Sequence, residues 1–343
     1  MIEDMLTKKS VHDYRLFHFY NNTFSVTLSL IFYVSLVFIA FKTTNSNIIH
    51  LKQTIYIVSC FEILLVLLFY MTQVEIEVLN GHEYFIICGF FKNVQYPYNM
   101  IVCGAYVFGI ISQVACSPII FVVRYLWIVK NYTLSNGFFI KFYSLAMLSS
   151  SIIAIIFFHS CVEEEMYDEQ IKDMKKHSQT RRFLNRFLRN GEATLLPRNF
   201  DVFVVIFEIA TASIFFTAMA TVTFCVSGTF KHLSDLQNVM TKSTRKMQVR
   251  LTKTLSTQFI ILLLFLYFPI GVYLLYFHSG NSTNGLGLFN NILISWSMFL
   301  TPLSTIVCIE PYRKYFVKYF IVRLRVKCLY HANCHKSTTI TDL

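Results

Sequence analysis

Residues 202–226 read VFVVIFEIATASIFFTAMATVTFCV, an apolar run in which Glu208 is the single charged residue. A helix rises about 1.5 Å per residue, so about 20 such residues cross the ~30 Å hydrocarbon core of a bilayer. A segment surrounded by lipid must satisfy its own backbone hydrogen bonds, which favours a helix over a strand. The same character recurs along the chain, and the seven predicted spans are residues 24–41, 54–71, 100–123, 142–158, 202–226, 255–277 and 286–309. The sequence therefore predicts an all-α membrane protein built as a seven-transmembrane helix bundle.

The composition agrees with a membrane protein and excludes a soluble enzyme of several domains. Of the 343 residues, 55% are hydrophobic and only 14% are charged, whereas soluble proteins carry about 25% charged residues. A formal net charge of +11 is compatible with nucleic-acid binding, but the lysines and arginines lie beside the spans, where they set membrane orientation. We therefore expect a lipid bilayer as a partner and no nucleic acid.

The orientation follows from the distribution of Lys and Arg, which are enriched in cytoplasmic loops. The segments after spans 1, 3, 5 and 7 hold 18 of the 30 basic residues, and the opposite set holds 12, of which 8 lie in residues 159–201. Long translocated loops follow the charge rule poorly, so we discount that loop. We predict an extracellular tail at 1–23, a seven-span domain at 24–309, and a cytoplasmic amphipathic helix with its tail at 310–343.

The predicted external segments contain candidates for covalent modification. Asn21 and Asn281 each begin an Asn-X-Ser/Thr sequon and are glycosylation candidates. Cys88 and Cys161 lie near the external ends of spans 3 and 4, where an oxidising exterior permits a disulfide; two unpaired thiols are the alternative. The loop at 161–201 turns from acidic to basic, which is compatible with an amphipathic lid or with a solvated loop.

The segment after the last span reads PYRKYFVKYFIVRLRVK over residues 311–327, in which aromatic and basic residues alternate at helical spacing. Such a segment is expected to lie along the inner membrane face as an amphipathic juxtamembrane helix, attracted by anionic lipid. Cys328 directly follows it and is a palmitoylation candidate, with a free cytosolic thiol as the alternative.

Several short motifs lie at the predicted inner ends of the spans. They are Val-Arg-Tyr-Leu-Trp at 123–127, RKMQVRLTKTLSTQ at 245–258, Tyr-Phe-Pro at 267–269, Pro302 in span 7, and Glu-Pro-Tyr-Arg at 310–313. Together these motifs resemble those of nematode serpentine chemoreceptors of the Str superfamily, with Srd and Str as the subfamilies they resemble first. The resemblance implies a fold like that of G-protein-coupled receptors, an odorant or other small-molecule ligand, a heterotrimeric G protein as partner, and a location in the plasma membrane of sensory cilia.

The resemblance also assigns roles on the predicted cytoplasmic side. Arg124 matches the arginine that holds the closed state and then meets the G protein, although Val123 stands where an acidic partner is usual. Pro269 matches a kink in span 6 that can act as a swing point. The activation and G-protein-facing candidates are Arg124, Tyr125, Arg245, Lys246, Arg250, Pro269, Pro302, Pro311, Tyr312 and Arg313. The basic residues among them are equally explained by the charge rule for cytoplasmic loops.

Two acidic residues inside spans are candidates for function, because buried charge is costly in lipid. Glu62 lies near the middle of span 2, where it could bind a cation or a proton or simply be hydrogen-bonded. Glu208 lies roughly 10 Å below the outer end of span 5, at the depth of a ligand pocket. Depth alone selects the other pocket candidates, which could equally be packing residues: Tyr106, Gln113, Tyr273, Tyr276, Asn291 and Trp296.

The sequence contains no HExxH metal motif, phosphate loop or dinucleotide fingerprint. We therefore expect neither an enzyme nor a bound metal or cofactor. The leading hypothesis is a chemosensory receptor coupled to a G protein. The alternative is a seven-span ligand-gated channel or transporter subunit that uses Glu62 and Glu208 along a polar path.

Overall fold

Seven membrane-spanning helices form the molecule. The computed structural model describes residues 2–42, 49–79, 82–87, 89–92, 94, 97–130, 132, 136–160, 194–197, 202–235, 242–279 and 286–318. Within these residues, the helices long and apolar enough to cross a membrane cover Phe17–Lys42, Ile55–Thr72, Tyr98–Lys130, Gly137–His159, Val202–Asp235, Thr252–Tyr276 and Phe289–Cys308. The predicted seven-helix bundle is confirmed, and the chain is a multi-pass membrane protein.

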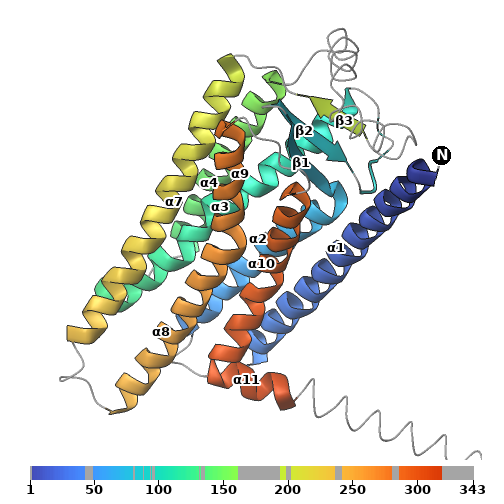
Figure 1. The fold of residues 1–343 in the computed structure, drawn as a ribbon. Helices are drawn as coiled ribbons and strands as arrows, with labels where there is room; N and C mark the ends of the chain where they lie inside the picture. Colours follow the sequence, from blue (N-terminus) through green and yellow to red (C-terminus); the bar gives the residue numbers. More distant parts are fainter. Residues whose placement is uncertain are drawn as a thin grey trace, which may run out of the picture.

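The helices run side by side along the long axis of the bundle (Figure 1). The first five spans are α1 (Ile2–Lys42), α2 (Ile49–Thr72), α3 (Tyr98–Lys130), α4 (Asn136–His159) and α7 (Val202–Asp235), and the last is α10 (Leu286–Cys308). The sixth span consists of α8 (Lys242–Leu262), a π-helical segment η2 (Leu263–Tyr267) and α9 (Phe268–Ser279). Because α1 begins at Ile2, it includes nearly all of the segment predicted as an extracellular tail.

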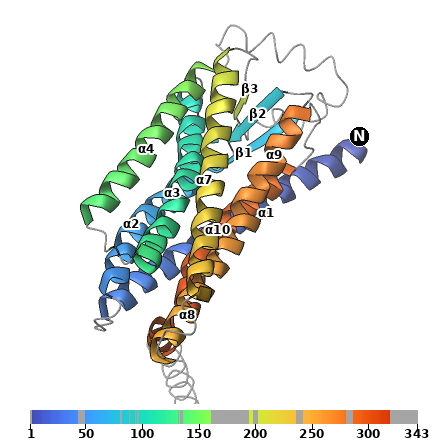
Figure 2. The same ribbon diagram turned by 90° about the vertical axis from the view of Figure 1, so that its left-hand side faces the viewer.

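The third span, α3, is the central helix of the bundle and packs against α2, α4 and α7 (Figure 2). Glycines permit two of these contacts. A Cβ atom on Gly104 would lie 2.7 Å from the Phe158 ring of α4, and a Cβ atom on Gly228 of α7 would lie 2.7 Å from the Tyr125 ring. Small residues at such positions let helices approach closely where lipid supplies no hydrophobic drive for their association.

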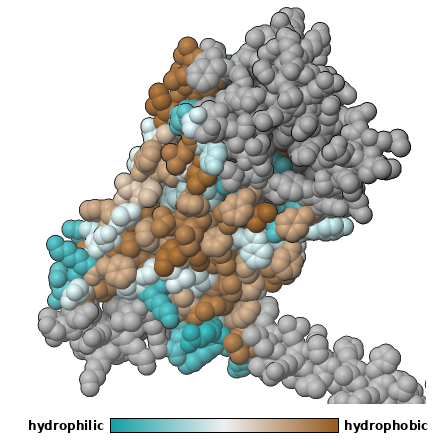
Figure 3. All heavy atoms as spheres, viewed as in Figure 1, coloured by the Kyte–Doolittle hydropathy of each residue, from teal (hydrophilic) through white to brown (hydrophobic). Residues whose placement is uncertain are grey.

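The outer surface of the bundle is apolar, as expected of a protein surrounded by lipid. A broad hydrophobic belt covers the middle of the molecule in Figure 3. The side chains of Leu145, Phe216 and Leu275 are 64%, 64% and 71% exposed. Polar side chains such as Ser29 and Ser112 are instead fully buried. Such an arrangement would be costly in water, so it supports placement in a bilayer.

The sixth span is irregular where its sequence contains Pro269. Proline has no backbone N–H, so the carbonyl group four residues earlier loses its helical donor. The π-helical segment η2 ends at Tyr267, two residues before this proline. Both features are recognised sites of helix kinking. The predicted swing point therefore coincides with a visible irregularity in the helix.

A three-stranded antiparallel sheet lies across one end of the bundle, which we call the sheet end. It consists of β1 (Val74–Leu79), β2 (His82–Ile87) and β3 (Thr194–Pro197), in the order β1-β2-β3. Val74 pairs with Ile87, and Phe85 pairs with Leu196. This sheet was not predicted from the sequence. Its buried face adds Val74, Phe85 and Ile87 to the main hydrophobic core.

The opposite end, which we call the α11 end, carries the short helix α11 (Glu310–Phe316). Figure 1 shows α11 running crosswise beneath the spans. Tyr312 anchors it, because its side chain is fully buried in a cluster with Leu36, Ile39 and Ile306. The predicted juxtamembrane helix therefore begins as expected, and the remainder of 310–343 after residue 318 lies outside the described residues.

Candidate functional site

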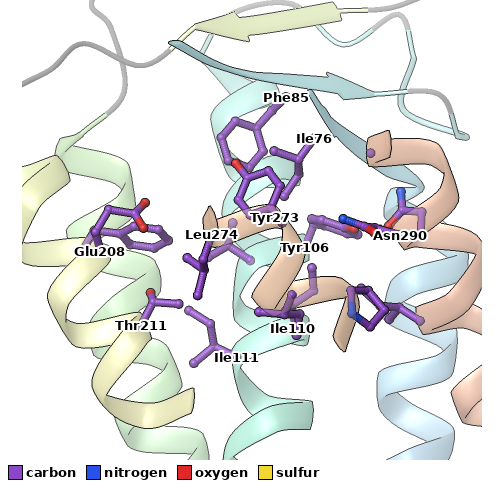
Figure 4. A pocket seen from close by; sticks show the side chains of 17 residues that line it. Ile76, Phe85, Tyr106, Ile110, Ile111, Glu208, Thr211, Tyr273, Leu274 and Asn290 are labelled. Carbon is purple, nitrogen blue, oxygen red and sulfur yellow. The ribbon is translucent and has the colours of Figure 1, made fainter. Parts of the chain in front are cut away.

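A cavity lies just beneath the sheet, enclosed by α3, α7, α9 and α10 (Figure 4). Its lining residues are Ile76, Phe85, Tyr106, Val107, Ile110, Ile111, Phe207, Glu208, Thr211, Pro269, Ile270, Tyr273, Leu274, Gly287, Asn290, Asn291 and Ile294. We call this space the main cavity because the sheet and four helices wall it; a larger and more open hollow of about 390 Å³ lies between α3, α4 and α7. Ile76 and Phe85 hang into it from β1 and β2, so the sheet forms its roof. Apolar walls with a few polar groups are typical of small-molecule sites.

The polar groups reach the main cavity from opposite sides. Glu208 and Thr211 face it from α7, on the same side because they are three residues apart in a helix. Tyr106 and Asn290 face it from α3 and α10 (Figure 4). The Glu208 side chain is buried, at 7% exposure. A carboxyl group at this depth is costly unless it is hydrogen-bonded or paired, so it is a candidate for recognition.

One wall of the main cavity is held by a short chain of hydrogen bonds. The Tyr106 hydroxyl donates to the side-chain oxygen of Asn291. The Asn291 amide nitrogen donates in turn to the backbone oxygen of Val74 at 2.6 Å. The chain therefore ties α3 to α10 and ties α10 to the first residue of the roof. It also fixes the Tyr106 ring, which packs edge-on against Phe69.

The size of the main cavity limits what it can hold. Its volume is about 90 Å³, whereas an apolar cavity of about 150 Å³ takes up benzene. A ligand of this cavity is therefore a small molecule of few heavy atoms. The lining contains the single carboxyl group of Glu208 and no basic side chain. The chemistry suits a small organic molecule of low polarity.

The structure brings four of the seven predicted pocket residues to the main cavity: Glu208, Tyr106, Tyr273 and Asn291. The other three lie elsewhere. Gln113 is deeper in the bundle, where its amide donates to the Ser297 hydroxyl at 3.3 Å. Trp296 faces α1 and donates to the side-chain oxygen of Asn21 at 3.2 Å. Tyr276 is half-buried near the end of α9 and does not line the cavity.

Sequence reasoning missed the roof and several wall residues of the main cavity. The roof had a readable signal, because residues 74–79 alternate in polarity and Asn80-Gly81 separates them from residues 82–87. An Asn-Gly pair between two such runs is a strong hairpin signal. No such signal identifies Thr211 and Phe207, because the direction in which their side chains point depends on the rotation of α7 about its axis.

At the α11 end, Arg124 is buried, with 4% of its surface exposed. Among the described residues, its Nε and Nη1 atoms have no hydrogen-bond partner. The preceding residue, Val123, packs against Phe139 and Tyr143 of α4. Its apolar side chain offers no hydrogen-bond acceptor to the guanidinium group. A buried cation with unused donors is costly, and such groups mark functional positions in membrane proteins.

The neighbouring predicted residues at this end make contacts within the protein. Tyr125 lies over Gly228 and tilts against Phe224 at 5.7 Å, so it forms part of the contact between α3 and α7. Arg313 donates to the backbone oxygen of Val307 at 3.2 Å, which closes the turn between α10 and α11. Pro311 lies in the first turn of α11, where proline is tolerated, and Pro302 lies within α10.

Side-chain hydrogen bonds also connect the helices between the two ends. Ser117 of α3 bonds to Tyr267 of η2 at 2.7 Å, close to the proline of the sixth span. Gln113 bonds to α10, as described above. Gln258 of α8 donates to Thr305 of α10 at 2.8 Å. The last of these bonds holds α8 against α10 and lies toward the α11 end.

Glu62 occupies a separate environment. Its carboxyl group lies beside the hydroxyl of Tyr33 on α1 and close to Cys116 and Tyr143. These groups come from three different helices, and the buried Tyr33 hydroxyl has no hydrogen-bond partner among the described residues. Glu62 does not line the main cavity. Binding of a cation or a proton, or a hydrogen bond to a neighbour, stays a prediction for this residue.

The structure describes only some of the remaining predicted residues, which are the modification candidates and the basic residues of α8. Asn21 lies within α1 and accepts the hydrogen bond from Trp296, so a glycan there would have to replace a contact between two spans. The other modification candidates, Cys88, Cys161, Asn281 and Cys328, lie outside the described residues. The backbone of α8 includes Arg245, Lys246 and Arg250, whose side chains also lie outside the description.

A bundle of seven spans, with an enclosed cavity near one end and a short crosswise helix at the other, defines the class of seven-transmembrane receptors. The chain matches the family model described as "Serpentine type 7TM GPCR chemoreceptor Str" over residues 18–317. It therefore belongs to this family, and the resemblance drawn from its sequence motifs is confirmed. A search of curated proteins finds no match to the chain.

Proposed function

We propose that this chemoreceptor binds a small molecule of low polarity in the main cavity and signals to a heterotrimeric G protein at the α11 end. One observation carries the proposal: Pro269 is both a wall of the main cavity and the irregular point of the sixth span. A ligand in the cavity therefore touches the segment at which that span can bend. Binding that favours one bend shifts the population of the two states.

The proposed orientation has the sheet end outside the cell and the α11 end in the cytoplasm. The charge distribution supports it, because the α11 end continues into 310–343, which holds seven of the basic residues. In this orientation the main cavity faces the environment, and Arg124 lies at the cytoplasmic end of α3. The plasma membrane of a sensory cilium is the location that family membership favours.

The proposed activation step is an outward movement of α8 about the Pro269 region. Such a movement breaks the bond between Gln258 and Thr305, which now ties α8 to α10. It also opens the space beside Arg124, whose unused donors then face an incoming partner. An acidic or carbonyl group on the partner would accept from these donors, and charge-assisted hydrogen bonds are the strong ones.

The test is a signalling assay in cells that express the receptor, using a panel of small neutral volatile and water-soluble compounds. Thr211→Val keeps the shape of a cavity wall but removes its hydroxyl, and Thr221→Val makes the same change further along α7, outside the cavity. We expect the first variant to shift the half-maximal concentration of active compounds about tenfold, and the second to leave it unchanged.

Two results would contradict the proposal. Equal behaviour of Thr211→Val and Thr221→Val across every active compound would remove the main cavity from ligand recognition. A ligand-evoked current that persists when G-protein function is blocked would favour a channel instead. Comparable surface amounts of each variant, measured by antibody labelling of an added epitope, are the required control.

A further inference from the structure

A second, smaller cavity lies beside the main one, between α1, α3, α10 and the end of α2. Its volume is about 20 Å³, which exceeds the 10–15 Å³ that roughly one water molecule requires. Its lining residues are His18, Asn21, Asn22, Phe69, Gln73, Tyr106, Asn291, Ile292, Ile294, Ser295 and Met298. We call it the polar cavity, because seven of these eleven residues have a polar side chain.

Gln73 is the unusual member of this wall. Its side chain is 2% exposed, and within the described part of the chain neither atom of its amide has a hydrogen-bond partner. Its backbone has φ 41°, in the left-handed region that a glutamine rarely adopts. A Cβ atom on the neighbouring Gly89 would lie 2.7 Å from the Gln73 Cβ atom, so the position tolerates no bulk behind it.

Both features of Gln73 oppose folding, so they require an explanation. A buried amide without partners loses its hydrogen bonds to water, and a left-handed glutamine adds backbone strain. Strain of this kind collects at binding sites, where the surrounding structure holds a group in place for a ligand. Gln73 is thus a lining residue of an internal cavity whose amide has an unused donor and an unused acceptor.

The charges near the polar cavity favour a neutral occupant. The Nε2 atom of His18 lies 3.5 Å from a carboxylate oxygen of Glu75, and both side chains are buried. Of these two groups, His18 lines the polar cavity and Glu75 does not. An ion entering this buried space would lose its hydration without a counter-ion among the described lining residues, which is costly.

The two cavities share a wall. Tyr106, Asn291 and Ile294 line both of them, and the hydrogen bond between Tyr106 and Asn291 forms the polar part of this boundary. A rotation of either side chain would join an apolar space to a polar one. The joined space would match a molecule with an apolar body and one polar end.

We propose that the polar cavity is the second half of the ligand site, in which the Gln73 amide hydrogen-bonds the neutral polar end, a carbonyl or a hydroxyl group, of a small ligand. The apolar body of the same ligand fills the main cavity. This inference rests on the proposed function, since it assumes that the main cavity binds the ligand. It adds the chemical class of the ligand and the residue that selects it.

The first test needs no ligand. Gln73→Leu replaces the unpaired amide by an apolar group of similar shape and similar backbone preference. We expect the melting temperature of the ligand-free receptor in nanodiscs to rise by about 2 °C. Gln258→Leu is the matched control, because that amide does have a partner at 2.8 Å, and its loss is expected to lower the melting temperature. A lower melting temperature for Gln73→Leu would show a structural amide and overturn the proposal.

The second test compares pentane, butanone, butanol, butylammonium and butyrate, which have similar length and differ at one end. The apparent affinity comes from the rise in melting temperature with compound concentration. For each protein we take the ratio of the apparent affinity for butanone or butanol to the apparent affinity for pentane. We expect this ratio to be about tenfold higher in wild type than in Gln73→Leu. Comparing the two proteins cancels the partitioning of each compound into the lipid. Met71→Leu, an apolar change at an exposed position outside both cavities, should behave as wild type.

The outcomes separate this inference from the proposed function. If pentane binds and the ratio of polar to apolar affinity is equal in wild type and Gln73→Leu, the proposal that the main cavity binds the ligand is retained. The proposed role of Gln73 is then rejected. Tighter binding of butylammonium or butyrate than of butanol would overturn the neutral class. If none of the five compounds, pentane included, shifts the melting temperature, both proposals fall together.

Discussion

At the α11 end, side chains close tightly around Tyr312 and Arg124, whereas at the sheet end they enclose two cavities. The first end is built from helices alone, and its tyrosine is fully buried. The second is roofed by strands, and it holds Gln73 in a strained conformation. The two ends therefore differ in construction: a buried tyrosine packs a short helix against the spans at one end, and strands roof a cavity at the other.

The largest effect that would test this comparison is on stability at the α11 end. Tyr312→Ala removes a fully buried ring from the contact of α11 with α1 and α10. We expect a loss of about 4 kcal/mol in the free energy of unfolding, in line with other large-to-small core changes. Lys314→Ala, which removes only the exposed ion pair with Glu310, should cost less than about 0.5 kcal/mol. Similar losses for both variants, in chemical denaturation of the purified receptor, would contradict the packing of Tyr312.

The equivalent change at the sheet end is Phe85→Ala. Phe85 is 2% exposed and packs edge-on against Phe157 at 4.9 Å, so we expect a loss of about 3 kcal/mol. Unlike Tyr312, it also forms the roof of the main cavity, and its removal enlarges that space. The signalling response should therefore shift toward larger compounds. An unchanged order of active compounds would mean that the roof does not set ligand size.

Arg124→Ala tests the signalling role of the α11 end. Charge-assisted hydrogen bonds contribute about 1.5–3 kcal/mol, so we expect a roughly tenfold to hundredfold loss of coupling. Delivery to the cell surface should be retained, because the guanidinium group leaves two of its nitrogen atoms unpaired in the described structure. Lys130→Ala, an exposed basic residue at the end of the same helix, is the control. Equal signalling by wild type and Arg124→Ala would remove the assigned role.

The smallest expected effect is at the bend between the two ends. Ser117→Ala removes the 2.7 Å hydrogen bond to Tyr267, which contributes about 1 kcal/mol. Because this bond holds η2 against α3, its loss should favour the bent state and raise signalling in the absence of ligand. Ser151→Ala, whose hydroxyl bonds only within its own helix, should leave that basal signal unchanged. A lower basal signal in Ser117→Ala would contradict this prediction and show that the bond stabilises the active state.

The sequence predicted the spans well because lipid imposes one strong rule on every one of them. A run of apolar residues of sufficient length has to be a helix, whatever surrounds it. The roof was missed because its strands are short and their pairing is not local: β3 comes from a segment more than a hundred residues beyond β2 in the chain. The irregularity at Pro269 was predicted, since a proline removes a helical hydrogen bond in any context.

The main cavity was predicted only in part because depth fixes the level of a residue and not the direction it faces. Trp296 follows Asn291 by five residues, or about 140° of rotation at roughly 100° per residue, and so faces α1. Gln113 follows Tyr106 by seven residues, which keeps the face but places it roughly 10 Å deeper. Gln73 has no sequence signal, because its importance comes from a backbone conformation and from missing partners.

The central claim is that a ligand at the sheet end moves α8 at the α11 end. The direct measurement is the distance between spin labels at Lys130 and Lys253, two exposed positions on α3 and α8, with and without the most potent compound of the panel. The account predicts a longer distance with ligand in wild type, and a smaller population of that longer distance in Thr211→Val at the same concentration. An unchanged distance at a concentration that gives full signalling would contradict it.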